Sequence, residues 1–347
     1  MAKHLIGVVG GSGYTGAELL RLLAGHPEME VGPVSAGSNA GKTVESLYPN
    51  LIPYAGRTFA AFDASAFAGC ALVFAGLPHG ESMAVVPSLL ALGAKVVDLS
   101  GDFRLADAES YRTWYGKQHV APELLGKGVY GLTELYRGKV SEATLVANPG
   151  CYPTATLLGL VPLVRSGLID PGSIVVQAAS GTSGAGRAPA PGLHFAHVDG
   201  NYSAYGITGH KHVSEMEAEL SGAAGAEVRI SFIPHLVPMA RGILATSTAQ
   251  MMPGVGESAL REALMQAYES EPFVHVLPVG ALPQTKATNG SNACHVTVRS
   301  DSRTGRAIVL AALDNLGKGA AGQAIQNANL MLGIPETAGL TAAGLYP

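Results

Sequence analysis

The chain has 347 residues, of which 47% are hydrophobic, 14% are charged and 45 are glycine. This composition is typical of a compact α/β protein with many tight turns, and the length favours two domains. It argues against a disordered or fibrous chain. The formal net charge of −4 also argues against nucleic acid as a partner, whereas an anionic small molecule is compatible with it.

The three cysteines, Cys70, Cys151 and Cys294, are far apart and form no CxxC pair. Such an odd, scattered set favours neither a disulfide framework nor a structural zinc site, and it fits a reducing compartment. The first apolar run spans only about five residues before glycines interrupt it, and no stretch approaches the roughly 20 apolar residues of a membrane span. We therefore expect a cytoplasmic protein with no membrane partner.

The stretch HLIGVVGGSGYTGAELLRLL reads as a strand, a glycine-rich turn and a buried helix, and its glycines match the G-x-G-x-x-G pattern. Small residues at such a turn let a pyrophosphate approach the backbone at the positive end of the helix. We therefore expect a dinucleotide site here, and the competing interpretation is a tightly packed turn without a ligand. The expected cofactor-binding residues are Gly10, Gly11, Ser12, Gly13, Tyr14, Thr15 and Gly16.

A second strand is expected at about residues 30–35. An NAD site usually carries an acidic residue near the end of this strand, about 20 positions after the glycines. Here the sequence is VSAGSNAGK, which has no carboxylate. Ser35, Ser38 and Lys42 offer hydroxyls and a cation that suit a 2′-phosphate, so the sequence favours NADP(H) over NAD(H). The competing interpretation is a polar surface loop.

Further strand-like runs at 71–78, 94–103 and 143–151 alternate with helical stretches. This rhythm predicts a doubly wound parallel sheet of the Rossmann type, an α/β fold, in residues 1–150. Ligands collect at the carboxyl ends of such strands, so LPHG with Pro78, DLSGDFR and NPGC are expected to line one crevice.

After Cys151 the apolar runs are mostly β-type, as in SIVVQAAS, EVRISFIPHLVP and NACHVTVRS. They predict an α+β domain with a mixed or antiparallel sheet in residues 151–317, which we expect to be the catalytic and substrate domain. A final long helix is expected at about 318–347.

Cys151 lies in the stretch NPGCYPTATLLGLV, where Pro153 suits the first turn of a helix. A helix N-terminus lowers the pKa of a thiol, and its N–H groups can hold an oxyanion. Both features serve a covalent acyl intermediate, so we interpret Cys151 as the nucleophile. Cys70 and Cys294 lie in or beside apolar runs and are expected to be buried hydrophobic residues.

A general base is expected from ITGHKHVSEMEAEL, where His210 and His212 directly precede a predicted helix at 213–220. On an extended segment these alternating side chains would face opposite ways, so that only one reaches a catalytic cleft. The competing interpretation is an H-x-H zinc pair, but no third ligand is evident, and we expect no metal. His194 and His197 are expected to have surface roles.

The chain resembles the N-acetyl-γ-glutamyl-phosphate reductase family of arginine biosynthesis, which is related to aspartate-semialdehyde dehydrogenase. The resemblance runs nearly end to end. It is carried by GSGYTG, LPHG, DLSGDFRL, NPGCYPTAT, SGTSGAGR, GHKH, RGILAT, GSNACHV and DNLGKGAAGQAIQNANLM. The blocks around Cys151 and DNLGKGAAGQA are the specific ones. A lysine-biosynthesis relative that acts on aminoadipyl phosphate tends to lack the Pro-Gly and Tyr-Pro flanks of the cysteine.

The resemblance implies an NADPH-dependent reduction of an acyl phosphate to an aldehyde with loss of inorganic phosphate. It implies Cys151 as nucleophile and His212, in preference to His210, as acid/base. The chain departs from the family at the middle of HKH, where arginine is common. It also lacks the arginine that often follows the second strand, which leaves the 2′-phosphate to Ser38 or Lys42.

Further residues are expected to bind substrate or cofactor. Arg104 and Arg187 are candidate clamps for a substrate anion, or else structural ion pairs. The small-residue run with Ser180, Gly181 and Ser183 would let the backbone approach the nicotinamide, and the resemblance suggests that Asn315 touches the cofactor. The resemblance also implies that the final helix, at about 318–347, returns to the first domain and completes it. It suggests a homodimer or homotetramer built through the second domain.

Two other functions are compatible with the sequence. One is the same chemistry on aspartyl or aminoadipyl phosphate. The other is an NADP-binding sensor without catalysis, against which the cysteine at a helix start and the histidine pair both argue.

Overall fold

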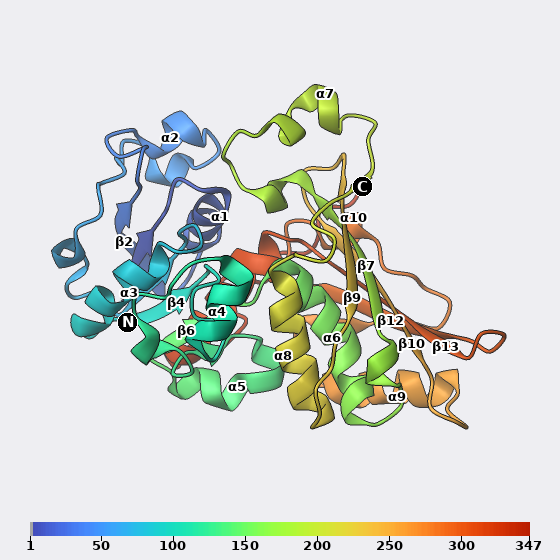
Figure 1. Ribbon diagram of the computed structural model, residues 1–347. Helices are drawn as coiled ribbons and strands as arrows, with labels where there is room; N and C mark the ends of the chain where they lie inside the picture. Colours follow the sequence, from blue (N-terminus) through green and yellow to red (C-terminus); the bar gives the residue numbers. More distant parts are fainter. Residues whose placement is uncertain (1–2) are drawn as a thin grey trace. The chain divides into compact units, whose positions relative to one another are not determined.

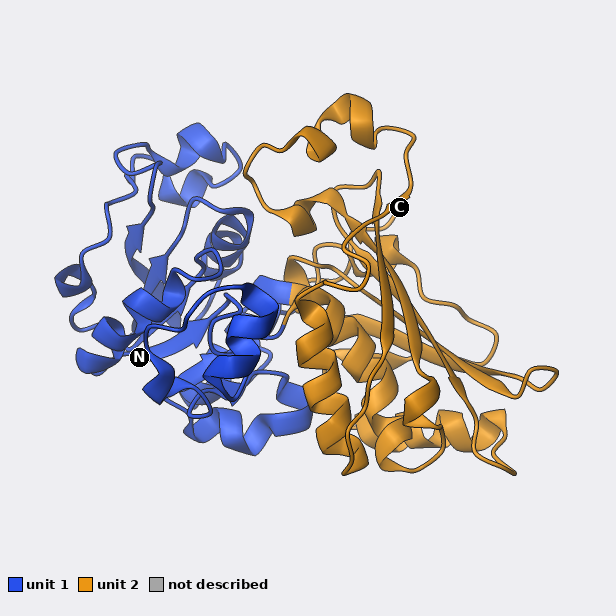
Figure 2. Ribbon diagram, viewed as in Figure 1, with its two compact units in different colours: residues 1–149, 320–341 blue, residues 150–319, 342–347 orange. Residues whose placement is uncertain are grey.

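In the computed structural model, which describes residues 3–347, the chain forms two compact units (Figure 2). The first extends to Pro149 and includes Ala320–Thr341, and the second comprises Gly150–Gly319 and Ala342–Pro347. The chain thus passes from the first unit to the second directly before Cys151.

The first unit contains a six-stranded sheet in which all paired strands are parallel, with the order β2-β1-β3-β4-β6-β5. Its strands are β1 (His4–Val9), β2 (Met29–Ser35), β3 (Leu72–Ala75), β4 (Lys95–Asp98), β5 (Val129–Tyr130) and β6 (Leu145–Ala147). The strand order reverses between β1 and β3, and in such sheets this is the position of the ligand crevice. The α/β prediction for this part of the chain is confirmed.

Helices accompany this sheet (Figure 1). They are α1 (Tyr14–Leu23), α2 (Val44–Leu47), α3 (Ser82–Ala91), α4 (Ala108–Tyr115), α5 (Thr133–Glu142) and α11 (Gly322–Met331), with 3-10 turns at Ile52–Tyr54, Ala64–Phe67 and Pro122–Leu124. Helix α1 buries Leu19, Leu20 and Leu23, the spacing of one helix face. Strand β3 is buried throughout, as expected of a parallel strand covered on both faces.

Helix α11 is held in the first unit by buried polar side chains. Asn327 Nδ2 donates to the Gly131 carbonyl at 2.8 Å and to Asn148 Oδ1 at 3.1 Å, and its Oδ1 accepts from Thr133 Oγ1 at 2.7 Å. Asn148 Nδ2 in turn donates to the Ala320 carbonyl at 3.1 Å. These bonds fix the segment that precedes Cys151.

The second unit contains a seven-stranded mixed sheet with the order β11-β12-β13-β10-β7-β9-β8. Its strands are β7 (Val175–Gly181), β8 (Ser203–Ala204), β9 (Ser231–Val237), β10 (Ile243–Gln250), β11 (Val274–Val276), β12 (Cys294–Asp301) and β13 (Arg306–Leu313). The β7–β9 and β11–β12 pairs are parallel and the others antiparallel, which confirms the predicted α+β architecture.

The second unit has helices α6 (Cys151–Arg165), α7 (Phe195–Val198), α8 (His212–Ala224), α9 (Glu257–Tyr268) and α10 (Thr285–Thr288), with 3-10 turns at Pro171–Ser173, Thr182–Ala185 and Pro191–Leu193. Figure 1 shows α6, α8 and α9 along one side of the sheet. Helix α6 approaches β13 so closely that a Cβ on Gly159 would lie 2.8 Å from Val309 Cγ1. Its helix continues through Pro162 to Arg165 without a break.

The last helix is shorter than the sequence analysis expects. A π-helical turn at Gly317–Ala321 precedes α11, which ends at Met331. Gly333 adopts a φ of +71° and Pro335 follows, a combination that stops a helix. Residues 342–347 group with the second unit, where the Leu345 N–H donates to the Asn289 carbonyl at 2.8 Å.

Candidate active site

Cys151 is the first residue of α6, as the sequence predicts, and Gly150 is its N-cap in an extended conformation. Cys151 forms no disulfide and is partly exposed, whereas Tyr152–Val164 are all buried. The first N–H groups of a helix have no acceptor within it, and the helix dipole is positive at this end. A 15-residue helix therefore presents its positive end at this thiol.

The other two cysteines are buried, as expected. Burial raises the pKa of the Cys70 thiol, which disfavours the reactive thiolate. Of the three cysteines, only Cys151 combines exposure with a helix N-terminus.

His212 is the first residue of α8 and lies directly against the residue that precedes the cysteine. A Cβ added to Gly150 would lie 2.5 Å from His212 Nε2, so any larger residue here would displace the imidazole. The His212 ring centroid is also 5.9 Å from that of Tyr152. An imidazole nitrogen thus reaches the turn that carries Cys151, where a general base is needed.

His210 has a different environment. Its ring lies edge-on to Tyr152, Tyr205 and Phe232, with centroids 5.3–5.7 Å apart. Its Nδ1 accepts the backbone N–H of His212 at 3.2 Å. Burial, aided by the charge of Lys211, lowers the pKa of His210 to about 4.

The expectation that the two histidines face opposite ways is wrong. Their ring centroids are 4.8 Å apart, because the chain turns into α8 at this point instead of running extended. His210 therefore supports the backbone of His212.

A stability test follows from the pKa of His210. Unfolding returns the pKa of His210 from about 4 to its ordinary value near 6.5. Between these two values the unfolded chain binds the proton and the folded chain does not. The free energy of unfolding therefore falls as the pH drops through this range. We expect the melting temperature of the wild type to fall more steeply between pH 6.5 and 5 than that of His210→Asn, which keeps an acceptor near Nδ1. Parallel curves for the two proteins, measured by circular dichroism, would contradict this prediction.

Glu215, one turn after His212 on α8, was not found by the sequence analysis. Its carboxylate is buried, and Oε2 accepts the Gly150 N–H at 3.0 Å. It thus holds the turn at which Cys151 begins its helix. The H-x-H-x-x-E spacing was the available signal, since residues three apart share a helix face.

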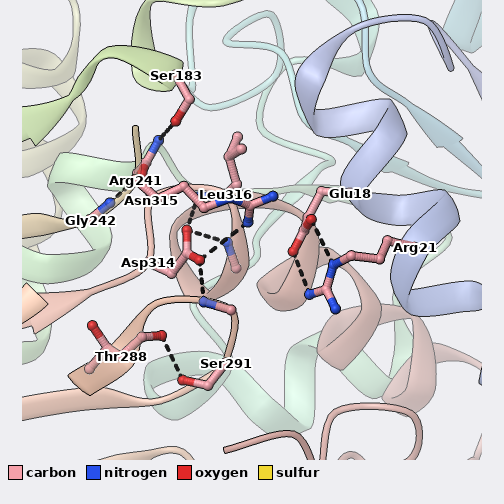
Figure 3. Close-up of polar contacts among 12 residues, drawn as sticks. Glu18, Arg21, Ser183, Arg241, Gly242, Thr288, Ser291, Asp314, Asn315 and Leu316 are labelled. Carbon is pink, nitrogen blue, oxygen red and sulfur yellow. Dashed lines mark hydrogen bonds and ion pairs between the residues drawn. The ribbon is translucent and has the colours of Figure 1, made fainter. Parts of the chain in front are cut away.

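The expected nicotinamide-side residues lie at the ends of β7 and β13 in the second unit. Asn315 Oδ1 accepts the Gly242 N–H at 2.8 Å, and its Nδ2 donates to Ser183 Oγ at 2.9 Å (Figure 3). Ser180 and Gly181 are buried at the end of β7. Asn315 therefore ties the Ser183 loop to the beginning of β10.

In the first unit the glycine turn follows β1 as expected. Gly10 has a φ of +79°, and a Cβ there would clash with the Gly76 carbonyl. A Cβ on Gly16 would lie 2.6 Å from Gly11 Cα, so this pair keeps helix and turn in close contact. At Gly13, the N-cap of α1, an added Cβ would meet no atom closer than 3.6 Å, so there is open space beside this residue. A phosphate can therefore approach the first turn of α1, at Tyr14 and Thr15.

The loop after β2 packs on this turn. Asn39 Nδ2 donates to Ser12 Oγ at 3.2 Å, and the exposed Lys42 Nζ donates to Asn39 Oδ1 at 3.1 Å. Ser35 Oγ is buried at the end of β2 without a hydrogen-bond partner, and Ser38 is exposed. The exposed Lys42 cation, on a loop without a carboxylate, fits a phosphorylated ribose.

The loops after β3 and β4 are joined by a buried carboxylate that the sequence analysis missed. Asp102 accepts the N–H groups of Gly80 and Met83 at 2.7 and 3.0 Å and the Tyr111 hydroxyl at 2.7 Å. Burial raises the pKa of neighbouring Asp98 to about 6. This network fixes the LPHG and DLSGDFR loops at the carboxyl edge of the sheet.

The remaining predicted residues have varied settings. Pro78 is exposed, and Arg104 donates from Nη2 to the Leu99 carbonyl at 3.0 Å. Arg187, His194 and His197 are exposed.

Within residues 3–347, no three His, Cys, Asp or Glu side chains gather closely enough to hold a metal ion. None of the helices described is long and apolar enough to cross a membrane.

Two family models match the chain. Residues 5–143 match the model described as "Semialdehyde dehydrogenase, NAD binding domain", and residues 151–315 match "Semialdehyde dehydrogenase, dimerisation domain". The fold is similar to that of a probable aspartate-semialdehyde dehydrogenase from Pseudomonas aeruginosa, with a TM-score of 0.70 at 19% identity over 95% of this chain and 98% of that one. It is also similar to the aspartate semialdehyde dehydrogenase of Candida albicans solved with NADP, with a TM-score of 0.66 at 19% identity over 95% and 99%.

The two domain matches and the fold identify the chain as an oxidoreductase of the semialdehyde dehydrogenase class, with an NAD(P)-binding domain. Its relatives include the N-acetyl-gamma-glutamyl-phosphate reductases of Desulforudis audaxviator, 49% identical over 99% of both chains, and Magnetococcus marinus, 48% identical over 99% of this chain and 98% of the relative. The chain belongs to the N-acetyl-gamma-glutamyl-phosphate reductase family, as its resemblance implies.

Proposed function

We propose that the chain catalyses, in the cytoplasm, the NADPH-dependent reduction of N-acetyl-γ-glutamyl phosphate to N-acetylglutamate 5-semialdehyde with release of phosphate, a step of arginine biosynthesis. The observation that carries the proposal is Cys151, a partly exposed thiol at the start of a 15-residue helix with His212 against the preceding residue. Relatives of full length that bear the reductase name, at 46–49% identity, support the choice of substrate.

The first half of the reaction forms a thioester on Cys151. His212 accepts the thiol proton, and Sγ attacks the acyl carbon. The C–S bond forms, and the C–O bond to phosphate breaks with its electron pair on the leaving oxygen, to which His212 returns the proton. Backbone N–H groups in the first turn of α6 stabilise the carbonyl oxygen as it gains charge. Glu215 holds the Gly150 N–H, so this turn is fixed in advance.

The second half releases the aldehyde. When bound, NADPH would supply a hydride at this site, and the acyl carbon of a thioester accepts hydride more readily than that of a carboxylate. The first turn of α6 then holds the alkoxide. As the carbonyl re-forms, the C–S bond breaks, its electron pair returns to Sγ, and His212 passes a proton from solvent to the thiolate.

The cofactor we propose is NADP(H). Gly10, Gly11, Ser12, Gly13, Tyr14, Thr15 and Gly16 would hold the pyrophosphate, and Ser35, Ser38 and Lys42 the ribose and its 2′-phosphate. The absence of a carboxylate after β2 and the cation of Lys42 support this choice. Pro78, Ser180, Gly181, Ser183 and Asn315 are proposed to contact the nicotinamide half.

Arg104 and Arg187 remain candidate clamps for a substrate anion, either the carboxylate or the phosphate. The proposed assembly is a homodimer or homotetramer built through the second domain, and the match of residues 151–315 to a dimerisation domain supports it.

The test runs the reaction in reverse, which avoids the labile acyl phosphate. We expect N-acetylglutamate semialdehyde to reduce NADP, followed as NADPH absorbance, only when phosphate is present, and to reduce NAD more slowly. Aspartate semialdehyde and aminoadipate semialdehyde should react at least about 10-fold more slowly, because one methylene in a fitted pocket is worth about that factor.

Faster turnover of one of the other two aldehydes would keep the mechanism and overturn the substrate. If none of the three aldehydes is turned over while NADP still binds, the result would support the non-catalytic sensor instead.

A further inference from the structure

One edge of the large sheet in the second unit gathers the ends of four neighbouring strands. Ser180, Ile243, Leu313 and Cys294 stand in register across β7, β10, β13 and β12. Arg241 lies two residues before β10, and Asp314 directly follows β13. Because β10 and β13 are antiparallel, these two side chains meet although 73 residues separate them.

The Asp314 carboxylate is built into this edge. Its side chain is 0% exposed, and its oxygens accept the N–H groups of Leu316 at 2.8 Å, Gly317 at 3.2 Å and Gly290 at 2.6 Å. Arg241 Nη1 lies 3.2 Å from Oδ2 (Figure 3). Three backbone amides also donate to this carboxylate, so its position is fixed, and the ion pair in turn orients the Arg241 guanidinium.

The same segment touches the nucleophile. The Asp314 carbonyl accepts the Gly319 N–H at 2.9 Å, and a Cβ on Gly319 would lie 2.8 Å from Cys151 Cβ. On the other side, a Cβ on Gly181 would lie 2.9 Å from the Arg241 backbone nitrogen. Arg241 therefore stands at the same edge as the proposed nicotinamide loop and is linked to Cys151 through six residues of chain.

We propose that Arg241 binds the α-carboxylate of the acyl-phosphate substrate and that Asp314 is the residue that positions it. The inference rests on the proposed function, because it assigns the far end of that substrate. The reacting carbonyl and its phosphate lie at Cys151, and the carboxylate lies four carbon–carbon bonds away along the same chain. A planar guanidinium matches a carboxylate through two parallel N–H bonds. The Arg241 side chain is 31% exposed, so part of it faces solvent, whereas the Asp314 side chain is fully buried.

The end of the chain supports this arrangement. The Leu345 N–H donates to the Asn289 carbonyl, and the Leu345 side chain packs on Gly290, whose own N–H binds Asp314. Gly344 lies so close to the Ala287 carbonyl that no Cβ fits there. The tail thus braces the turn that holds Asp314, and through it Arg241.

The experiment removes the carboxylate from the substrate as well as the arginine from the protein. Wild type, Arg241→Gln and Arg241→Lys are assayed with N-acetylglutamate semialdehyde and with 4-acetamidobutanal, which is the same molecule without its carboxylate. We expect kcat/KM of the wild type to fall on the order of 100-fold when the carboxylate is absent, the scale of a charged hydrogen-bonded pair. Arg241→Gln should show a similar loss on the full aldehyde, mainly as a higher KM, and almost no further loss on 4-acetamidobutanal.

Arg241→Lys keeps the charge without the planar fork and should give an intermediate KM. The matched control is Arg303→Gln, the same change at the opposite end of the β12–β13 pair, where the side chain is 84% exposed. It should leave both aldehydes unaffected. NADPH binding, followed by fluorescence titration, should be unchanged in every variant.

Three outcomes would overturn the inference. If the wild type turns over the two aldehydes equally well, the inference is overturned without any variant. An Arg241→Gln protein that loses the same factor on both aldehydes would show a structural role only, and an unaffected one would show no role. If the wild type prefers aspartate semialdehyde, the proposed substrate fails alone, and the comparison is repeated with 3-aminopropanal, its carboxylate-free analogue. If no aldehyde is turned over, both proposals fail.

Discussion

Replacement of Cys151 by serine is expected to lower phosphate-dependent NADP reduction by at least about 10³-fold, the scale seen when a covalent nucleophile is removed. The serine hydroxyl keeps nearly the same shape at the start of α6. Its proton is far harder to remove, so the positive helix end that favours a thiolate does not produce an alkoxide at neutral pH. The loss is measured with N-acetylglutamate semialdehyde and saturating phosphate.

The intermediate can be detected directly. Wild type incubated with the acyl phosphate in the absence of NADPH should gain the mass of the acyl group on the peptide that contains Cys151, and the serine variant should not. Cys70→Ala is the matched control, because it removes a buried thiol and should leave both acylation and turnover intact. A serine variant that retains a tenth of the activity would contradict the predicted loss.

Replacement of His212 by glutamine is expected to lower kcat by about 10²- to 10⁴-fold, the usual contribution of a general acid/base. Glutamine places an amide nitrogen near the position of Nε2 but transfers no proton. The wild type should lose activity as the pH falls, because a protonated His212 cannot accept the proton of Cys151. This acidic limb of the pH–rate profile should be absent from the variant.

His210→Asn is the comparison for this experiment. Its ring is neutral above about pH 4 and accepts the His212 N–H, so the variant should lose far less activity than His212→Gln and keep the acidic limb. The reverse ranking of the two variants would assign the acid/base to His210.

The architecture of both units was predictable from local sequence. Apolar strands alternating with helices fix a parallel sheet, and the glycine turn after β1 and the helix start at Cys151 both rest on signals within a few residues. Strand β5 was missed because it has only two residues, Val129 and Tyr130. The predicted final helix is too long, because Gly333 and Pro335 stop α11 soon after Met331.

The partners of the supporting side chains were not predictable in this way. Glu215 and the Gly150 amide are 65 residues apart, and Arg241 and Asp314 are 73 residues apart. Only strand register and helix packing bring such partners together, and no local pattern encodes either. The orientation of the two histidines failed for a related reason, because the turn into α8 places rings together that an extended segment would separate.

The docked tail has a practical consequence for work with this protein. Only two residues would separate an affinity tag joined after Pro347 from Leu345, whose main chain is hydrogen-bonded to the turn that holds Asp314. A tag placed before β1 instead enters at the amino ends of the parallel strands, at the edge opposite the glycine turn. Kinetic constants for the acyl substrate should therefore be taken from protein tagged at the amino end or from which the tag has been cleaved.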